Sequence, residues 1–574
     1  MSEIGKLKKF FSESFDHKTQ ILIRVAIIGI LIGITAVAFR KSTEWLEQFL
    51  FQNYYTKEHW YDWLYMPMVC AIAGLFVGFI TVKFAPDAAG SGIPQVKHAL
   101  NSSGAIIKLR TAFVKFIGGV VGIASGLSLG REGPTIQIGA GLASKVSKLM
   151  GGKHRKRAIA SGAGAGLAAA FNTPIAGVIF VIEELDKNMS SLALGPAIVC
   201  SVSAAVTCRI LYGNFFTFHF MSEHEVSLIH LPFYIGFGIL AAIIGVYFQR
   251  SIIWGMDVYE KKLTAVPNWA WGGVAGLITG IVGLFVPQAL GGGHTTLEGV
   301  LAGAYTWMFI PLIFLFKYLL TVVAYGSGVP GGIFAPSLIL GALLGSFTGH
   351  MLNLGFPALN IDPANFAFVG MGAFFTAISR APITSIVMLF ELTGNYQLVL
   401  PLMFACILAN ISAERLKNGS LYRDLLERQG ISIKEYSTPS YLQRFSVEDA
   451  MTRKVDWLKH TTTLEELEHL FETHDHSGYP IVDENQKLIG VVTKQDLLHA
   501  HTSKLGDKTP VELIMSTNLK LLTPTDNLHT AILRLYEFKI GRLLVVDETN
   551  SGKLLGIITR SDIINFEANQ ELDY

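Results

Sequence analysis

Long uncharged apolar runs recur throughout the first 410 residues of this 574-residue chain. A membrane-spanning helix needs about 20 consecutive apolar residues, and several runs approach or exceed that length. Only 16% of the residues are charged, whereas soluble proteins carry about 25%. We therefore predict an α-helical polytopic membrane domain over residues 21–430, surrounded by a lipid bilayer. Its clearest spans are Ala158–Ile182, Asn188–Cys208, Leu231–Gln249 and Tyr318–Gly349.

Basic residues predict how this domain is oriented. Cytoplasmic segments are enriched in Lys and Arg, so we predict a cytoplasmic N-terminal segment over residues 1–20 and a cytoplasmic loop at Lys153–Arg157. No small-residue cleavage site follows the first apolar run, which excludes a signal peptide. Short connections favour a bacterial cytoplasmic membrane with both termini in the cytoplasm. The basic residues before and within the start of the first run are Lys6, Lys8, Lys9, Lys18 and Arg24.

The net charge of +2 does not indicate a surface that binds nucleic acid, and we predict no nucleic-acid partner. The four cysteines all lie in apolar stretches and form no CxxC pair. They are interpreted as small buried apolar residues, so neither a disulfide framework nor a metal site is predicted. They are Cys70, Cys200, Cys208 and Cys406.

The tail of the chain is more charged and repeats itself after about 65 residues. Ser446–Met451 is echoed by Pro510–Met515, and Leu488–Asp496 is echoed by Leu554–Asp562. Each copy predicts a helix, β-strands and a closing helix. The two copies, over residues 441–505 and 506–574, resemble a tandem pair of soluble α/β CBS domains.

The CBS resemblance implies four nucleotide-ribose positions in the tail. A Thr-x-x-Asp sequence after a strand is also a capping box that starts a helix. Adenine-nucleotide binding is therefore left open. The four residues are Thr493, Asp496, Thr559 and Asp562.

The membrane region also contains an internal repeat. Gly164–Glu183 aligns with Gly372–Glu391 at a constant offset of 208, with glycine, alanine, proline and glutamate in register. Gly133–Pro134 has a counterpart in Ala335–Pro336. Gly/Pro-interrupted segments at corresponding places in two halves point to the binding site of a transporter. The sequence leaves open whether the halves are inverted or parallel.

Three Gly/Pro-rich segments interrupt helices: Gly90–Pro94, Gly130–Pro134 and Gly328–Pro336. Each has proline at or near the first turn of the following helix, where its missing N–H does no harm. Each helix N-terminus should therefore expose unpaired backbone N–H groups and roughly half a positive charge. Several such helix ends meeting at mid-membrane can hold an anion. No fixed full positive charge is then needed, and such a charge would bind the anion too tightly to let it leave.

Glu132 lies in the second of these segments, beside Arg131, and no charged residue occurs from Phe116 to Gly130. An ionisable residue at bilayer depth is costly, so it is a functional-site hypothesis by default. The alternative is an interfacial acid paired with Arg131. The neighbouring glycine and proline residues favour a transport site instead.

The three segments, in this order, resemble those of the CLC chloride channels and transporters. So do the acidic pair Glu183–Glu184, which closes an apolar helix, and Tyr422, which follows the last apolar helix. The resemblance covers roughly residues 20–430. It implies that Ser91 and Tyr422 supply hydroxyl groups to a central anion and that the backbone N–H groups of Ile333 and Phe334 complete its shell. Serine at position 91 is the residue type that accompanies chloride in this family. The predicted anion-binding residues are Ser91, Gly92, Ile93, Gly133, Ile333, Phe334 and Tyr422.

The resemblance also assigns two proton-handling acids. Glu132 would be the gating glutamate, whose carboxylate occupies an anion position when ionised and swings away when protonated. Glu184 would be the inner proton-transfer residue that marks the exchangers of the family. An acid at the end of an apolar helix can also be simple polarity at the lipid headgroups.

The leading hypothesis is a homodimeric chloride/proton antiporter with one anion pathway per subunit and no required cofactor. The alternative is a passive, gated chloride channel of the same fold. Glu184 discriminates between them, because an exchanger needs a proton acceptor on the inner side and a channel does not.

Two other classes are excluded, and we predict that the protein is not an enzyme. An intramembrane metalloprotease needs His-Glu-x-x-His, whereas in His224–His230 the second histidine comes two residues too late. A magnesium transporter needs acidic rings, whereas the interrupted segments offer helix N-termini, which have the wrong sign for a cation.

Overall fold

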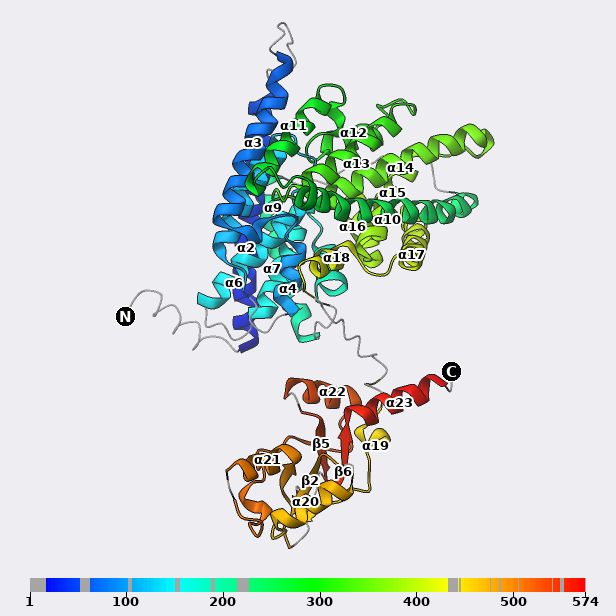
Figure 1. Ribbon diagram of the computed structural model, residues 1–574. Coiled ribbons are helices and arrows are strands. Elements are labelled where there is room, and N and C mark those ends of the chain that lie inside the picture. Colours follow the sequence, from blue (N-terminus) through cyan, green and yellow to red (C-terminus); the bar gives the residue numbers. More distant parts are fainter. Residues whose placement is uncertain are drawn as a thin grey trace. The chain divides into compact units, whose positions relative to one another are not determined.

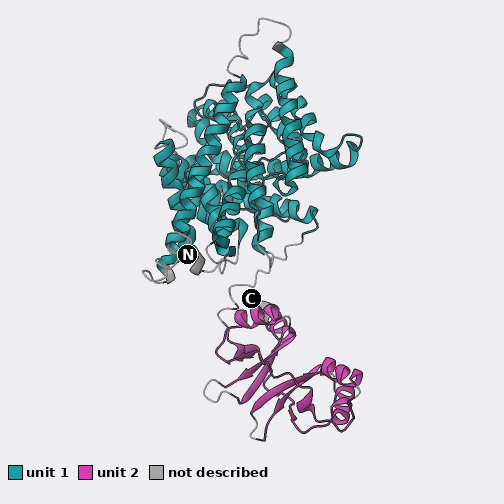
Figure 2. Cartoon of the chain, turned by 90° about the vertical axis from the view of Figure 1, so that its left-hand side faces the viewer, with its two compact units in different colours: residues 1–433 teal, residues 434–574 magenta. Residues whose placement is uncertain are grey.

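The chain forms two compact units in the computed structural model, residues 1–433 and residues 434–574 (Figure 2). The structure describes residues 17–51, 62–101, 106–149, 155–186, 191–213, 227–431, 442, 445–474, 476–484, 487–503, 505–538, 540–547 and 552–572. Residues 1–16 of the predicted N-terminal segment and residues 153–154 of the predicted cytoplasmic loop lie outside the described residues.

The first unit consists of helices joined by short connections (Figure 1). Its first half contains α2 (His17–Phe51), α3 (Asp62–Phe84), η1 (Pro86–Ala88), α4 (Ile93–Asn101), α5 (Leu109–Ala124), α6 (Glu132–Leu149), α7 (Arg155–Phe171), α8 (Pro174–Phe180), the π-helical turn η2 (Val181–Leu185) and α9 (Ser191–Tyr212).

The second half of this unit begins with η3 (Leu228–His230) and α10 (Leu231–Lys262). It continues with η4 (Asn268–Ala270), α11 (Trp271–Gly283), η5 (Pro287–Ala289), α12 (His294–Leu301), α13 (Ile310–Gly326), α14 (Phe334–Gly355), η6 (Pro357–Leu359), α15 (Pro363–Ser379), α16 (Pro382–Thr393), η7 (Tyr396–Leu398), α17 (Val399–Leu416) and α18 (Leu421–Arg428).

Within the part of the chain that the structure describes, six helical stretches are long and apolar enough to cross a membrane. Large apolar side chains cover much of their outer surface, as a lipid environment requires; Phe79 is 41% exposed and Ile210 is 76% exposed. The six stretches are Thr19–Phe51, Trp63–Phe84, Leu194–Tyr212, Leu228–Lys262, Phe334–Gly355 and Tyr396–Arg428.

The internal repeat appears as matching elements that run in opposite directions. Glu183, at the end of the α8–η2 helix, accepts hydrogen bonds from two backbone N–H groups at the start of α16, at 3.0 and 2.7 Å. Glu391, at the end of α16, accepts two from the start of α8, at 3.1 and 2.8 Å. Because each helix end caps the start of the other, α8 and α16 lie antiparallel. Antiparallel counterparts are the arrangement of inverted repeats, which resolves the alternative that the sequence left open.

The helices of the second half pack closely through glycine. α14 lies against α15, and a Cβ atom added at Gly345 would lie 2.0 Å from the carbonyl oxygen of Phe366. One turn earlier, a Cβ at Gly341 would lie 2.2 Å from the carbonyl oxygen of Gly370. Small residues four positions apart are the usual means by which membrane helices bring their backbones together.

Replacing Gly345 with alanine is therefore expected to destabilise the first unit by about 1–3 kcal/mol, because the new methyl group overlaps a backbone atom that cannot move away. The measurement is thermal unfolding of the purified protein in detergent. Gly355→Ala, near the end of the same helix, is the matched control, because nothing lies within 4 Å of its added Cβ. Equal unfolding temperatures for the two variants would contradict the packing argument.

The second unit contains two copies of one α/β arrangement, as the sequence repeat predicted. In each copy the first strand pairs parallel to the second and the second pairs antiparallel to the third. The strands are β1 (Leu458–Lys459), β2 (Gly478–Val482), β3 (Leu488–Thr493), β4 (Leu521–Leu522), β5 (Arg542–Val546) and β6 (Leu554–Thr559). The helices are α19 (Val447–Ala450), α20 (Leu464–Thr473), α21 (Lys494–Thr502), η9 (Val511–Leu513), α22 (Leu528–Glu537) and α23 (Arg560–Leu572).

The leading segment of each copy packs on the other copy. Val447, which precedes the first sheet, belongs to the apolar core of the second copy together with Leu522 and Leu528. Val511, which precedes the second sheet, belongs to the core of the first copy with Leu464. The two copies therefore form one folding unit.

Candidate functional site

The three interrupted segments are joined to one another by backbone hydrogen bonds. The N–H of Gly130 donates to the carbonyl of Gly332 at 2.6 Å, and the N–H of Gly332 donates back to Gly130 at 2.7 Å. The N–H of Gly331 donates to the carbonyl of Gly90 at 3.0 Å. Segments more than 200 residues apart in the sequence therefore form one backbone cluster.

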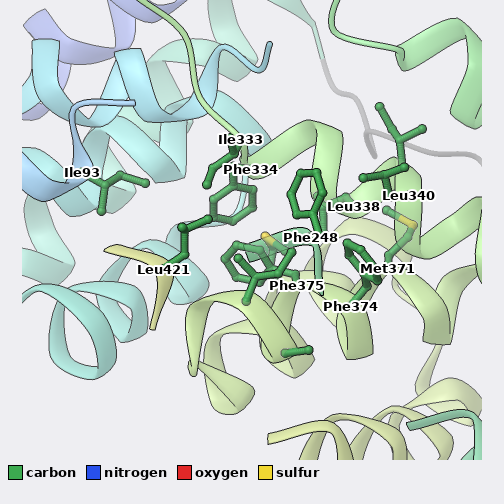
Figure 3. Close-up of a cluster of buried hydrophobic side chains, with 14 of the residues drawn as sticks. Ile93, Phe248, Ile333, Phe334, Leu338, Leu340, Met371, Phe374, Phe375 and Leu421 are labelled. Carbon is green, nitrogen blue, oxygen red and sulfur yellow. The ribbon is translucent and has the colours of Figure 1, made fainter. Parts of the chain in front are cut away.

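The residues predicted to bind an anion are buried around this cluster. Ser91, Ile93, Ile333, Phe334 and Tyr422 are each at most 1% exposed. Figure 3 shows Ile93, Ile333 and Phe334 approaching one another, with the first residue of α18 close by. The structure thus brings together residues from four separate helix starts.

Close backbone contact explains the glycines of the cluster. A Cβ atom added at Gly133 would lie 2.6 Å from the carbonyl oxygen of Ser91. Gly92 has a φ of 91°, and an added Cβ there would lie 2.5 Å from the side-chain oxygen of Gln137. Side chains at these two positions would push the segments apart.

The helix starts supply hydrogen-bond donors to the cluster. In α14 the first intrahelical bond runs from the N–H of Ser337 to the carbonyl of Ile333, so the N–H groups of Phe334 and Ala335 have no acceptor within the helix. In α4 the N–H of Ile93 donates to the hydroxyl oxygen of Ser91 at 3.2 Å. Ser91 therefore also caps its helix in this structure.

Glu132 is the first residue of α6 and is fully buried. The backbone N–H groups of Glu132 and Ala335, at the starts of α6 and α14, interact with its carboxylate in a geometry short of a full hydrogen bond. Arg131 ion-pairs instead with Glu44 of α2, at 3.6 Å. This geometry contradicts the alternative of an interfacial acid paired with Arg131. The Glu132 carboxylate therefore lies where the N–H groups of two helix starts attract negative charge.

Glu184 is also buried, with an exposure of 2%. Its carboxylate forms an ion pair with Lys97 of α4 at 3.0 Å and accepts a hydrogen bond from the hydroxyl of Ser420 at 3.3 Å. Glu184 is thus buried within the protein and paired there, and its proton-transfer role stays a prediction. Tyr422 is an electrostatic neighbour of both Glu184 and Glu132.

The adjacent acids Glu183 and Glu184 have different contacts, and both lie in a π-helical turn, a feature common at functional sites. Glu183 caps α16, as its repeat counterpart Glu391 caps α8. The counterpart of Glu184 is Leu392, so the buried inner acid occurs in one half alone.

Two buried lysines, which the family resemblance did not assign, hold corresponding loops in the two halves. Lys115 of α5 is fully buried and donates to the carbonyls of Ala88 and Gly90, at 2.8 and 2.6 Å. Lys317 of α13 is fully buried and donates to three carbonyls of the loop from Ala289 to Gly291, at 3.2, 3.2 and 2.7 Å. Lys115 thereby fixes the segment that contains Ser91.

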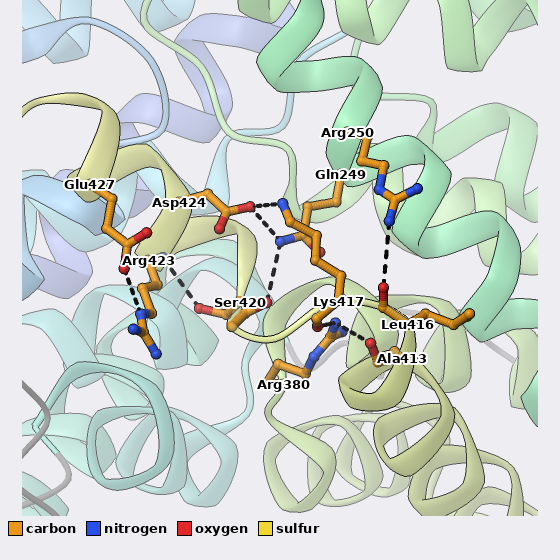
Figure 4. A network of polar contacts seen from close by, with 11 residues as sticks. Gln249, Arg250, Arg380, Ala413, Leu416, Lys417, Ser420, Arg423, Asp424 and Glu427 are labelled. Atoms are coloured by element: carbon orange, nitrogen blue, oxygen red, sulfur yellow. Dashed lines mark hydrogen bonds and ion pairs between the residues drawn. The ribbon is translucent and has the colours of Figure 1, made fainter.

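A polar network fixes the start of α18, which contains Tyr422 (Figure 4). Lys417 and Gln249 both donate to the carboxylate of Asp424, the latter at 2.7 Å. The hydroxyl of Ser420 accepts from the N–H of Arg423 and so caps the helix. The same serine contacts Glu184, which links the position of Tyr422 to the inner acid.

A cavity of about 770 Å³ adjoins Arg131, the residue before Glu132. Its lining residues include Glu44, Glu47 and Glu298 and the first residues of α12. It provides a wide space beside Arg131 that the sequence alone did not reveal.

In the second unit, the predicted nucleotide residues form two capping boxes. Asp496 accepts hydrogen bonds from the backbone N–H and the hydroxyl of Thr493, at 2.8 and 2.7 Å. Asp562 has the same contacts with Thr559, at 2.8 and 2.7 Å. These residues therefore start helices α21 and α23, and nucleotide binding stays a prediction.

The fold and the site define a polytopic membrane protein with inverted repeats, interrupted helices and a buried cluster of helix starts. The voltage gated chloride channel family matches residues 73–414, and the CBS domain family matches residues 447–503 and 511–569. The chain belongs to the voltage gated chloride channel family, or CLC family, and its predicted fold class is confirmed.

Relatives of known name are transporters. The chain is 34% identical over 419 residues to the H(+)/Cl(-) exchange transporter ClcA of Klebsiella pneumoniae (strain 342), covering 71% of this chain and 88% of that protein. It is 34% identical over 428 residues to the protein of the same name from Vibrio parahaemolyticus serotype O3:K6 (strain RIMD 2210633), covering 71% of this chain and 89% of that one.

Two solved structures share the fold. A slow cyanobacterial Cl-/H+ antiporter superposes with a TM-score of 0.68 and 30% identity, over 72% of this chain and 99% of that one. A eukaryotic CLC transporter has a TM-score of 0.65 and 20% identity, over 94% of this chain and 97% of that one. The second likeness concerns the fold alone.

Proposed function

We propose that the protein exchanges chloride for protons across a membrane. The observation that carries this proposal is the burial of two acids beside the cluster of helix starts: Glu132 begins α6, and Glu184 contacts Ser420, which caps the helix that contains Tyr422. An anion held by the Tyr422 hydroxyl and the helix starts would lie near both proton-handling groups. The named exchangers among its relatives support the same function.

The proposed cycle rests on competition for the helix N-termini. When ionised, the Glu132 carboxylate is attracted to the same N–H groups as chloride, because both are anions. Proton uptake removes its charge and lets chloride take its place. Glu184 would pass protons between the inner solution and Glu132, so that one acid serves each side of the anion site.

The remaining assignments follow from the family. We propose a homodimer with one pathway per subunit, in a bacterial cytoplasmic membrane and with both termini in the cytoplasm. The proposed anion shell consists of Ser91, Gly92, Ile93, Gly133, Ile333, Phe334 and Tyr422. The CBS pair would regulate transport, with adenine nucleotide as a candidate ligand near Thr493 and Thr559.

A passive channel of the same fold is the competing function, and one experiment separates the two. Purified protein is reconstituted in liposomes with chloride higher outside, the membrane potential is clamped with valinomycin and potassium, and external pH is recorded. An exchanger drives protons out against their gradient as chloride enters. Chloride entry without a proton signal would establish the channel instead.

Glu184→Gln is expected to abolish the proton signal in this assay while chloride flux continues, because glutamine cannot carry a proton. Glu183→Gln is the matched control on the neighbouring residue. Its amide oxygen can still cap α16, so proton movement should remain coupled to chloride. Loss of coupling in both variants would show that the π-helical turn, and not the acid at position 184, is what matters.

A further inference from the structure

Lys97 is a buried cation beside the inner acid, and neither the sequence pattern nor the family resemblance assigned it a role. It lies on α4, one helical turn after Ile93, and is 3% exposed. Its ammonium nitrogen is 3.0 Å from a carboxylate oxygen of Glu184. The helix that carries the anion-binding segment is therefore tied directly to the inner acid.

We propose that Lys97 is a positioning residue that sets the proton affinity of Glu184, and this inference rests on the proposed function. A cation at ion-pair distance favours the ionised carboxylate, so Glu184 takes a proton only when the inner solution is sufficiently acidic. The ion pair also orients the carboxylate between α4 and the start of α18, where Ser420 is its second contact.

Other ionisable groups surround the turn that contains Glu184. Helices α4, α7 and α8 pack against its turn. Besides Lys97, α4 carries only His98, which is exposed, and α8 has no ionisable residue. The other groups are Glu183 and Asp186 at the same turn, the basic first turn of α7 (Arg155, Lys156 and Arg157), and Arg380 and Tyr422, which act on Glu184 electrostatically.

The ion pair has a consequence for the anion. When Glu184 accepts a proton, the charge of Lys97 loses its partner in a buried place, which is unfavourable. A chloride ion near the start of α4 would restore the balance. Proton uptake at Glu184 and anion occupancy would thus favour each other through one lysine.

The test is infrared difference spectroscopy of the full-length protein in liposomes during titration of pH. The carboxyl band that disappears in Glu184→Gln is assigned to Glu184. In Lys97→Met its midpoint is expected to move to higher pH by about one unit or more, since one unit corresponds to about 1.4 kcal/mol of interaction. Lys97→Arg keeps the charge and should keep the midpoint close to that of the wild type.

Lys317→Met removes an equally buried lysine that has no carboxylate at ion-pair distance among the described residues, so it should leave the Glu184 band unchanged. An unchanged midpoint in Lys97→Met would overturn the proposal, as would an equal shift in Lys317→Met. The infrared band is read without any transport. A wild-type protein that moves no protons would refute the proposed exchange function, and the infrared test would still decide whether Lys97 sets the proton affinity of Glu184.

Discussion

Replacing Glu132 with glutamine is expected to produce a protein that still conducts chloride, no longer responds to pH and moves no protons. Glutamine has the shape of the protonated acid but cannot ionise. It therefore cannot compete with chloride for the helix starts, and it cannot carry a proton. The measurement is chloride efflux from liposomes from acid to neutral pH, together with the external pH record.

The structural basis for this large effect is the position of the Glu132 carboxylate at two helix starts. It is fully buried, and the backbone N–H groups of Glu132 and Ala335 act on it in a geometry short of a full hydrogen bond. Its charge is therefore what attracts the side chain to these N–H groups. Glu47→Gln is the control, because this acid lines the cavity beside Arg131 and does not lie at a helix start in the cluster. It should keep the proton signal and the pH dependence. Retained pH dependence in Glu132→Gln would assign the gate to another residue.

Much of this site could be predicted because its signals are local in the sequence. Glycine and proline at Gly90–Pro94, Gly130–Pro134 and Gly328–Pro336 mark helix starts without any knowledge of distant contacts. The constant offset of 208 likewise exposed the repeat, since matched helices keep matched residues. Glu132 stood out because an acid within an apolar run is costly.

The remaining features depend on contacts between distant segments. Lys97 and Glu184 are 87 positions apart, and Ser420 and Glu184 are 236 positions apart. A lysine on a short amphipathic helix gives no sign of a buried partner. The repeat aligned Glu183 with Glu391, but the sequence did not show that each of these two acids caps the helix that carries the other.

In the second unit, the sequence repeat predicted the two copies but not the exchange of their leading segments. Val447 and Val511 each lie at the start of their own copy, before its first strand, yet each packs into the core of the other copy. The pattern of apolar residues shows that such a segment must be buried. It does not show which of two similar cores receives it.

Replacing Lys115 with methionine is expected to weaken chloride binding at the central site at least tenfold, or by about 1.4 kcal/mol. The Lys115 ammonium holds the carbonyls of Ala88 and Gly90, and the Gly90 carbonyl also accepts the N–H of Gly331. Without it, two buried carbonyls lose a hydrogen-bond donor and the Ser91 segment loses its fixed position. Isothermal titration of chloride into the purified protein gives the affinity, and thermal unfolding gives the stability.

Lys317→Met is the control that separates a local effect from a general one. Both lysines are fully buried and both bind loop carbonyls, so both variants should lose stability, by about 1–3 kcal/mol for each unsatisfied polar group. Only Lys115 holds the loop that contains Ser91, however, and Lys317 holds the loop before α12. Chloride affinity should therefore fall in Lys115→Met alone. An equal fall in both variants would mean that the lysines act through overall stability or net charge, and that the Ser91 segment holds its position without Lys115.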